Sequence, residues 1–542
     1  MTAATVSEYS AGRMTSEQRM VIFASSLGTV FEWYDFYIYG TLGVFLAKYF
    51  FSNVPANVGF IFALLAFAAG FAVRPFGALI FGRLGDMIGR KYTFLITMSL
   101  MGVGTFFIGV LPGYDSWGIM APIVLIGLRL VQGLALGGEY GGAAIYVAEH
   151  APKNKRGFYT SWIQTTATLG LFMALLLILG IRTAMGEQAF GEWGWRIPFL
   201  LSAILLAVSI WIRLKLNESP LFQKMVAEGK TSKKPLKEAF GVWANAKIAI
   251  LALFGATAGE AVVWYGGQFY ALFFLTQTLK VPAVDSQIMI AIALLIGTPC
   301  FILFGWLSDK IGRKPIMLAG FALAALTYFS IFQGITHFAN PKLEKALAAS
   351  PVTVTADSSE CSFQFKATGT EKFTTGCDNI KAALVGLSVN YENVSAAKGT
   401  PASVKIGDQV IPASTPNLAA AITTAVRSHG YPASADTKDI NYVMTVVLLT
   451  ILVIYVTMVY GPIAAWLVEL FPTRIRYSGL SLPYHIGNGW FGGFLPATVF
   501  AIVAATGNIY SGLWYPIIVA TMSFVVGLLF LPETKDRDIT NM

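Results

Sequence analysis

Apolar residues in this sequence gather into long runs that are separated by short polar stretches. Twelve runs stand out, and each reaches the about 20 residues that an α-helix needs to cross a bilayer. They predict twelve transmembrane helices at residues 20–49, 57–82, 92–111, 117–148, 158–183, 196–215, 248–279, 286–307, 315–338, 441–470, 478–505 and 509–531.

Positive charges occupy every second connection between these runs. One side holds Arg83, Arg90, Lys91, Lys153, Lys155, Arg156, Lys310, Arg313, Lys314, Arg474 and Arg476, and the lysines of the long segment 216–247 join them. The short connections on the opposite side carry only Lys48, Arg182 and Lys280. Because positively charged loops stay in the cytoplasm, both termini and segment 216–247 are expected there. Residues 1–19 are polar and the first run is about twice as long as a signal-peptide core, so we expect no cleaved signal.

Composition agrees with a membrane protein. Hydrophobic residues make up 55% of the 542 residues and charged residues 12%, well below the about 25% of a soluble domain. Mean hydropathy is +0.63. The net charge of +9 then reflects membrane topology rather than nucleic-acid binding. We therefore expect a multi-pass protein of the inner (plasma) membrane.

The sequence lacks the residue patterns of an enzyme active site or a metal site. The GKT at 229–231 suggests a phosphate-binding loop, but that motif requires glycine where Lys224 stands. Only four histidines occur, without the Cys/His spacing of a metal site. We expect no catalytic residues, no metal and no cofactor.

Two segments of the chain occur twice. GRLGDMIGRK at 82–91 returns as GWLSDKIGRK at 305–314, an offset of 223 residues. YGGAAIYVAEHAPKNKR at 140–156 returns as YGPIAAWLVELFPTRIR at 460–476, an offset of 320 residues. The chain is thus two six-helix halves of one design, and the second half carries an insertion between its third and fourth helices. Repeats of this kind are typical of transporters that rock two bundles about a central site.

These motifs resemble those of a known family. The doubled segment Gly82-x3-Asp86-x2-Gly89-Arg90-Lys91 and the Arg129-x2-Gln132-Gly133 of the fourth helix are similar to signatures of the major facilitator superfamily. Within it, Glu32-Trp33-Tyr34-Asp35-Phe36, Arg74-Pro75-x-Gly77, Trp195-Arg196-Ile197-Pro198-Phe199 and Glu218-Ser219-Pro220 resemble the metabolite:proton symporter family. That family includes permeases for α-ketoglutarate, citrate, shikimate and proline/betaine. The resemblance covers almost the whole chain except roughly residues 340–440, and it does not specify the substrate.

The expected architecture is all-α within the membrane, with twelve helices in two pseudo-symmetric bundles and a small α/β insertion outside the membrane. The expected parts are a cytoplasmic N-terminus (1–19), an N-terminal bundle (20–215), a cytoplasmic linker (216–247), helices 7–9 (248–338), a periplasmic insertion (339–440), helices 10–12 (441–531) and a cytoplasmic tail (532–542).

Three carboxylates inside predicted spans are candidates for proton coupling. Glu32 and Asp35 share one stripe of the first helix with Tyr39, and such a stripe must face protein or a water-filled cavity. Glu139 lies in the fourth helix. A carboxylate whose hydration changes as the cavity opens to either side can load and release a proton. The alternative for Glu32 and Asp35 is a structural ion pair with a neighbouring arginine.

Arg129, near the middle of the fourth helix, is the main candidate for substrate binding. It stays charged, so it must pair with a carboxylate of the protein, such as Asp35, or of the substrate. A fixed structural pair is the alternative. Arg74 has either a substrate or a structural role, and the adjacent Pro75 can break the second helix. The other candidate substrate contacts, for which ordinary helix packing is the alternative, are Tyr39, Gln132, Gln164, Glu260, Trp264, Gln268, His485 and Asn488.

The doubled motif is expected to gate the cytoplasmic side. Gly82 permits close helix approach, and Asp86 can cap a helix of the other half, where the helix dipole favours an anion. We expect Arg90, Glu149 and Arg156 to orient Asp86. The matching set is Asp309, Arg313, Glu469 and Arg476.

The insertion contains 9 Lys/Arg and 9 Asp/Glu. Alternating segments at 352–356, 361–367 and 403–411 predict strands, and 417–426 predicts a helix. Cys361 and Cys377 are expected to form a disulfide, with free thiols as the alternative.

The sequence thus predicts a proton-coupled symporter that takes up a small organic metabolite. A carboxylate is the favoured substrate class. The alternatives are uptake of a zwitterionic osmolyte and a non-transporting membrane sensor with a ligand-binding insertion. Expected partners are the substrate, with a proton as coupling ion, and the lipid bilayer. We expect a monomer.

Overall fold

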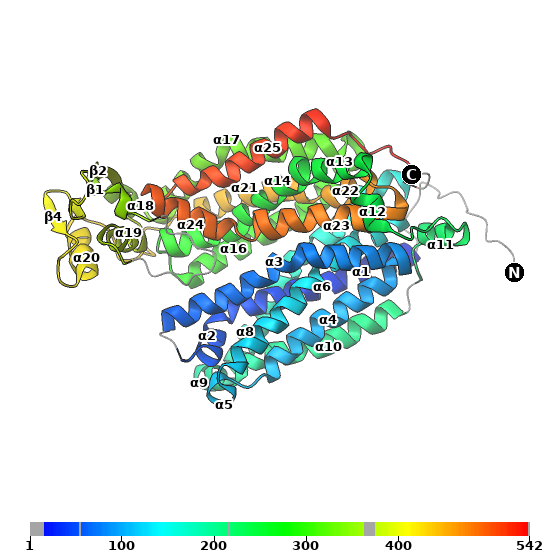
Figure 1. Cartoon of the computed structure of the whole chain (residues 1–542), viewed down its shortest axis with the longest axis horizontal. Coiled ribbons are helices and arrows are strands. Elements are labelled where there is room, and N and C mark those ends of the chain that lie inside the picture. The colour runs from blue at the N-terminus through cyan, green and yellow to red at the C-terminus, as the bar shows by residue number, and fades with distance from the viewer. Residues whose placement is uncertain (1–15, 54–55, 215–216, 363–373, 540–542) are drawn as a thin grey trace.

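The computed structural model describes residues 16–53, 56–214, 217–362 and 374–539. Two helical bundles lie side by side, and a small domain projects from one end of the second bundle (Figure 1). Ten helical segments of the described chain are long and apolar enough to cross a membrane. The two remaining predicted spans are present as α1 and α3, which pack within the first bundle.

The first bundle contains α1 (Ser16–Thr41), α2 (Gly43–Phe50), α3 (Ala56–Ile88), α4 (Arg90–Val110), α6 (Met120–His150), α7 (Arg156–Gln164), α8 (Thr166–Met185) and α10 (Ile197–Leu214), with the short α5 (Tyr114–Trp117) and α9 (Glu187–Glu192) at one end. Pro75 lies inside α3 without interrupting it, so the helix break expected there is wrong.

The second bundle contains α13 (Trp243–Ala252), α14 (Ala258–Tyr265), α15 (Ala271–Phe273), α16 (Ala283–Ile311), α17 (Arg313–Ala339), α21 (Tyr442–Tyr460), α22 (Ile463–Leu470), α23 (Arg476–Ile486), α24 (Leu495–Thr506) and α25 (Trp514–Phe530). π-helical turns at Leu253–Thr257, Gly266–Tyr270 and Phe274–Thr278 join α13, α14 and α15 into one rod, and a π-helical turn at Gly487–Gly492 follows α23. Such turns are common near functional sites.

The doubled motif forms helix ends rather than loops. α3 continues to Ile88, six residues beyond its predicted end at 82. α16 continues to Ile311, four residues beyond its predicted end at 307. Gly89 (φ 110°) and Gly312 (φ 113°) each form the whole turn into the next helix, in a backbone region that favours glycine. The aspartate of each motif therefore sits on a rigid last turn.

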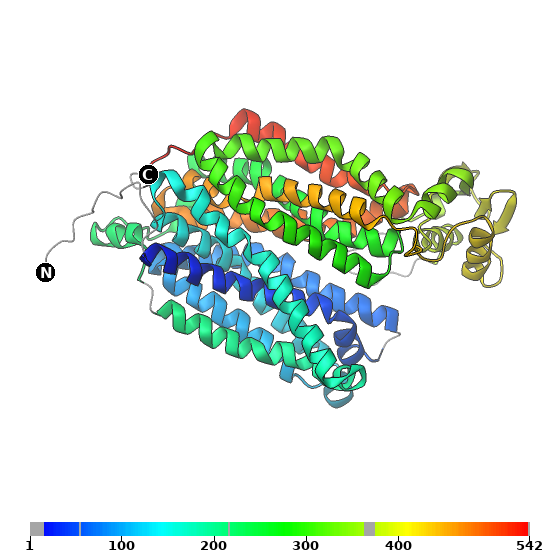
Figure 2. The same cartoon turned by 180° about the vertical axis from the view of Figure 1, so that it is seen from behind.

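Two short helices of the linker, α11 (Pro220–Ala227) and α12 (Pro235–Phe240), lie at the end where α25 stops. The insertion lies at the opposite end (Figures 1 and 2). Single 3-10 turns precede α7, α10, α23 and α25 and follow the first strand of the insertion, at Lys153–Lys155, Gly194–Arg196, Thr473–Ile475, Ser511–Leu513 and Ser358–Glu360.

The insertion is a small α/β domain, as predicted. Its elements are α18 (Pro341–Ala349), β1 (Val352–Asp357), α19 (Gly376–Gly386), β2 (Glu392–Ala396), β3 (Ser403–Ile406), β4 (Gln409–Pro412) and α20 (Leu418–Ser428). The sheet order is β2-β1-β3-β4, with β1 parallel to β2 and antiparallel to β3. Most of the strand predicted at 361–367 lies outside the described residues. A disulfide joins Cys361 and Cys377, with 5.3 Å between their Cα atoms.

Candidate functional site

A chain of hydrogen bonds inside the first bundle connects Asp35 to Arg129. Arg129 Nη1 donates to Gln132 Oε1 at 2.7 Å, and Gln132 Nε2 donates to Thr105 Oγ1 at 2.6 Å. Thr105 Oγ1 in turn donates to Asp35 Oδ2 at 2.8 Å. Tyr39 places its ring 4.1 Å from the Arg129 guanidinium. All five side chains are buried, from three different helices of one bundle.

The three hydrogen bonds all run in one direction, because each donor lies on the Arg129 side of its bond and each acceptor on the Asp35 side. The pairing that the sequence suggested between Asp35 and Arg129 is mediated here by Thr105 and Gln132. Thr105 was missed by the sequence analysis. A lone threonine in an apolar helix is common and gives no signal of its own. Protonation or deprotonation of Asp35 would therefore alter the hydrogen bonding of Arg129 through Thr105 and Gln132.

A central cavity of about 20 Å³ lies between the bundles, enough for about one water molecule. Four predicted site residues line it: Glu32 and Arg74 from the first bundle, and His485 and Asn488 from the second. The remaining lining residues, which sequence reasoning did not select, are Thr29, Trp33, Phe36, Leu136, Tyr140, Ile163, Tyr265, Tyr460 and Tyr484.

Tyrosines of the two bundles meet beside the cavity in matching pairs. Gln164 Nε2 donates to the Tyr140 hydroxyl at 2.8 Å, and the Tyr484 and Tyr460 hydroxyls are 3.1 Å apart. Each member of the first pair lies 320 residues before its counterpart in the second. The rings of Tyr140 and Tyr484 stack at 3.8 Å across the bundle interface. The repeat therefore contained a signal for Tyr140 and Tyr460, since both begin its second segment.

Glu260, Glu139 and Gln268 do not line the cavity, whereas Asn488 and His485 do. Glu260 Oε2 accepts a hydrogen bond from Asn488 Nδ2 at 2.9 Å. Both ring nitrogens of His485 and both carboxylate oxygens of Glu139 are buried without a hydrogen-bond partner among the described residues. Gln268 is also buried but does not line the cavity. A closed interior holding several such carboxylates is costly unless protons or ligands compensate for it.

An aromatic layer closes the side of the cavity that faces the insertion. Trp33 and Trp264 pack with ring centroids 5.1 Å apart, each from a different bundle. One turn farther along α1, Phe36 and Tyr37 pack against Phe269 at 5.5 and 6.0 Å. Aromatic pairs of this kind contribute about 0.5–1.5 kcal/mol each beyond area burial. They make a seal that can separate without breaking any covalent or ionic bond.

Two helix caps close the other side. Asp86 accepts hydrogen bonds from the backbone of Tyr477 (3.1 Å) and Ser478 (2.8 Å) at the start of α23 in the second bundle. An ideal Cβ on Gly82 would lie 3.0 Å from the Ser478 Cα, so glycine allows the close approach. The expectation that Asp86 caps a helix of the other half matches this geometry.

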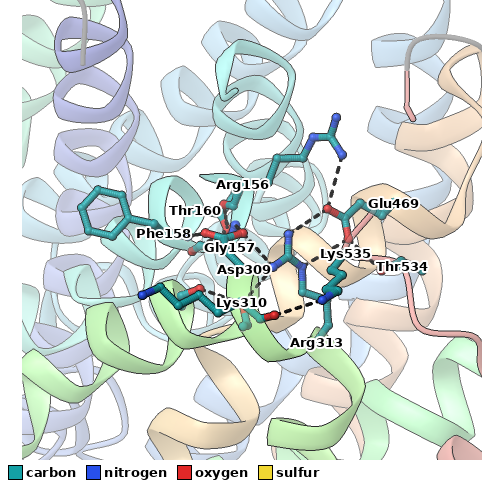
Figure 3. A network of polar contacts seen from close by, with 12 residues as sticks. Arg156, Gly157, Phe158, Thr160, Asp309, Lys310, Arg313, Glu469, Thr534 and Lys535 are labelled. Carbon is teal, nitrogen blue, oxygen red and sulfur yellow. Dashed lines mark hydrogen bonds and ion pairs between the residues drawn. The ribbon is translucent and has the colours of Figure 1, made fainter. Parts of the chain in front are cut away.

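The second cap mirrors the first. Asp309 accepts from the backbone of Gly157 (2.9 Å) and Phe158 (2.8 Å) at the start of α7 in the first bundle (Figure 3). Arg313 holds the same aspartate at 2.7 Å. Each bundle thus supplies one capping aspartate and one capped helix, so the two caps hold the same interface from both sides.

The arginines group differently from the prediction. Glu149 is joined by Arg90 at 3.7 Å and by Arg476 at 2.7 Å, whereas Arg156 pairs with Glu469 at 3.4 Å. The assignment of Arg156 to the Asp86 cluster, and of Arg476 to the Asp309 cluster, is therefore wrong. Arg476 and Arg156 are the first residues of the capped helices α23 and α7. Because each capped helix begins at the interface between the bundles, its first residue lies close to the glutamate of the other bundle and pairs with it.

Residues that follow the last helix of each bundle also belong to these two clusters. The sequence analysis did not assign them to the clusters. The Ser219 hydroxyl donates to Glu149 and the Thr534 hydroxyl donates to Glu469, the latter at 2.7 Å. The preceding residues, Glu218 and Glu533, accept from backbone N–H groups at the starts of α4 and α17. A signal was present, because Glu-Ser and Glu-Thr follow the last helix of each half.

The molecule is therefore closed on both sides of a central cavity that lies between two bundles of one repeated design. Ion pairs and caps that can break close one side, and aromatic contacts close the other. Two repeated bundles around a central cavity are typical of secondary membrane transporters.

The chain belongs to the sugar (and other) transporter family of the major facilitator superfamily, whose family model matches residues 20–253 and 417–542. It is 36% identical over 329 residues to the shikimate transporter of Escherichia coli, covering 59% of this chain and 73% of that protein. It is 37% identical over 316 residues to the proline/betaine transporter of E. coli, covering 56% of this chain and 62% of that protein.

The fold is similar to that of the proton:xylose symporter XylE bound to 6-bromo-6-deoxy-D-glucose. The TM-score is 0.66 at 16% identity, with 97% of this chain and 98% of that chain covered. The resemblance to the major facilitator superfamily and the expected all-α membrane fold are confirmed. The protein is a multi-pass membrane transporter of small metabolites and not an enzyme.

Proposed function

We propose that this protein is a proton-coupled symporter that takes up a small organic carboxylate across the inner membrane, with both termini in the cytoplasm and as a monomer. The observation that carries the proposal is the buried chain from Arg129 through Gln132 and Thr105 to Asp35. It places a permanent cation and a titratable carboxylate in one hydrogen-bonded unit, three side-chain contacts long.

Coupling follows from competition within this unit. When Asp35 is ionised, Gln132 and Thr105 are held in the orientation that directs their donors toward it. Protonation of Asp35 adds a donor and removes the charge, which frees Arg129 for a substrate carboxylate. Glu32 and Glu139 are the next proton candidates. Arg74, beside the Phe71 ring at 4.3 Å and on the cavity wall, is the second candidate cation for the substrate.

The similarity to the shikimate transporter supports a carboxylate substrate, because shikimate carries one carboxylate. A zwitterionic osmolyte is the second candidate, supported by the similarity to the proline/betaine transporter and by the aromatic cavity wall. The rings of Trp33, Tyr140, Tyr265 and Tyr460 could face a quaternary ammonium group, which aromatic faces attract.

The test is uptake by proteoliposomes under an imposed pH gradient. Purified protein is first screened by thermal shift against carboxylates, aromatic acids and betaines, and each stabilising compound is then supplied in labelled form. Accumulation of a carboxylate that collapses when the pH gradient is dissipated supports the proposal. Accumulation of betaines alone would favour the second candidate. Absence of accumulation for every stabilising compound would favour a sensor that binds without transport.

A further inference from the structure

The insertion is docked onto the second bundle at the outer ends of two helices. Tyr391 N donates to Gly507 O at 2.7 Å, and Ser388 Oγ donates to Gln277 O at 3.2 Å. Ala435 N donates to Lys280 O at 3.0 Å. An ideal Cβ on Gly507 would lie 2.2 Å from Tyr391 O, so this contact requires glycine. The domain is therefore a fixed part of the second bundle rather than a loosely tethered appendage.

A cavity of about 270 Å³ lies within this junction, more than ten times the volume of the central cavity. It is close to the lower end of the about 300–1,000 Å³ that small-molecule sites occupy. Its walls come from the end of the seventh transmembrane segment, from α19 and the loop after it, and from the α24 region. The lining residues are Gln277, Thr278, Lys280, Val385, Gly386, Ser388, Val389, Phe500, Val503, Gly507 and Ile509.

The lining divides into a polar edge and an apolar wall. Lys280, Ser388, Thr278 and Gln277 provide an ammonium, two hydroxyls and an amide, while the rest of the wall is mainly aliphatic with one phenyl ring. The Lys280 ammonium makes no hydrogen bond or ion pair with any residue that the structure describes. Partial burial lowers the pKa of Lys280, and the nearby charge of Arg427 acts in the same direction. The lining residues include this one basic side chain and no acidic side chain, and an anion bound beside Lys280 would favour the charged form of its amine.

Backbone strain is concentrated at the same place. Three non-glycine residues of the described chain have a positive φ, and two of them, Lys280 (φ 55°) and Ser388 (φ 60°), line this cavity. Such conformations are uncommon for side-chain-bearing residues and persist where the surroundings hold them. Lys280 belongs to the second bundle and Ser388 to the insertion, so a strained residue lines the cavity from each side of the junction. Glycine would relieve this strain at either position but would remove the ammonium or the hydroxyl.

We propose that this junctional cavity binds a small organic anion that has one carboxylate and an apolar body. The carboxylate pairs with the Lys280 ammonium, and the apolar body rests on Val385, Val389 and Phe500. No residue of the first bundle lines this cavity among those described. The site is thus separate from the central one, and it stands whether or not transport is proton-coupled.

Protection of a cysteine from a thiol reagent tests this site without using transport. Val385 lines the cavity from within α19, where its helical backbone tolerates substitution. The variant is Val385→Cys in a Cys300→Ala background, because Cys300 is the free cysteine of the described chain. N-ethylmaleimide labelling of the full chain in nanodiscs is timed with benzoate, and with the uncharged benzamide as its matched control.

Benzoate at ten times its dissociation constant is expected to slow labelling about tenfold, whereas benzamide should leave the rate unchanged. Lys280→Met should remove this protection, and Lys280→Arg should retain it. The exposed Lys405 is the matched control, so Lys405→Met should retain protection. Arg129→Lys, which alters the proposed central site, should retain it too. Equal protection by benzamide, protection that survives Lys280→Met, or protection lost in Arg129→Lys would overturn the proposal.

Discussion

Removing one charge from a helix cap should open the side of the transporter that the caps close. In Asp86→Asn, one amide oxygen can still accept from α23, but the new NH2 group faces a backbone N–H donor. The variant loses one of two charge-assisted bonds, at 3.1 and 2.8 Å, and the ion pair with Arg90 at 3.7 Å. A hydrogen bond to a charged group contributes about 1.5–3 kcal/mol, so a loss of about 2 kcal/mol corresponds to about 30-fold in the closed-to-open equilibrium.

Labelling of a cysteine at the interface measures this equilibrium. Ser481 is buried on α23 and contacts Gly141 of the other bundle, so Ser481→Cys in the Cys300→Ala background reports on separation of the bundles. If labelling requires opening, Asp86→Asn should speed it about 30-fold in detergent-free nanodiscs.

Matched substitutions separate the latch from general destabilisation. Asp309→Asn removes the mirror-image cap and should also speed labelling at position 481, because both caps hold one interface. Asp115→Asn changes an exposed aspartate that bonds Ser52 and should have no effect. Unchanged labelling in Asp86→Asn, or equal acceleration in Asp115→Asn, would refute the assignment of the caps as a latch.

Three further variants test other parts of the account. Arg129→Lys should weaken binding of a carboxylate by at least about tenfold despite the conserved charge, because the guanidinium fork is lost; near-normal affinity by calorimetry would contradict the anion proposal. Replacing 345–435 with a Gly/Ser linker should leave an inserted, proton-coupled transporter, since Asn441 N bonds Phe338 O at 2.8 Å and the ends are adjacent; complete loss of uptake with intact insertion would place this domain in the mechanism. Cys361→Ser should lower the stability of the insertion by about 3 kcal/mol while uptake persists, and an unchanged protease-resistance midpoint for the domain would argue against a stabilising disulfide.

Sequence patterns sufficed for the elements that repeat or that stay apolar over a full span. The runs located every long helix because a membrane span must be apolar over its whole length. The doubled motif located both caps, since Asp86 and Asp309 occupy equivalent positions in the two halves. The repeat could not show which bundle each arginine reaches. That depends on the capped helix, whose first residue crosses the interface.

Isolated polar residues and irregular strands could not be predicted from the sequence, for a different reason. Thr105 is surrounded by apolar residues in the sequence of α4, and only the folded packing brings it to Asp35. β2 (Glu392–Ala396) has mostly exposed side chains and so lacks the alternation that predicts a strand. The junctional cavity needs residues from three distant segments of the chain, and no local sequence pattern predicts that they meet.

In the proposed mechanism, Asp35 couples proton movement to substrate movement. The direct measurement compares the wild type with Asp35→Asn in proteoliposomes, using a labelled carboxylate that the wild type accumulates. We predict that Asp35→Asn loses accumulation driven by a pH gradient yet still exchanges external for internal substrate, because exchange needs no net proton transfer. Uphill accumulation at the wild-type level in Asp35→Asn would contradict the claim and move the proton site to Glu32 or Glu139.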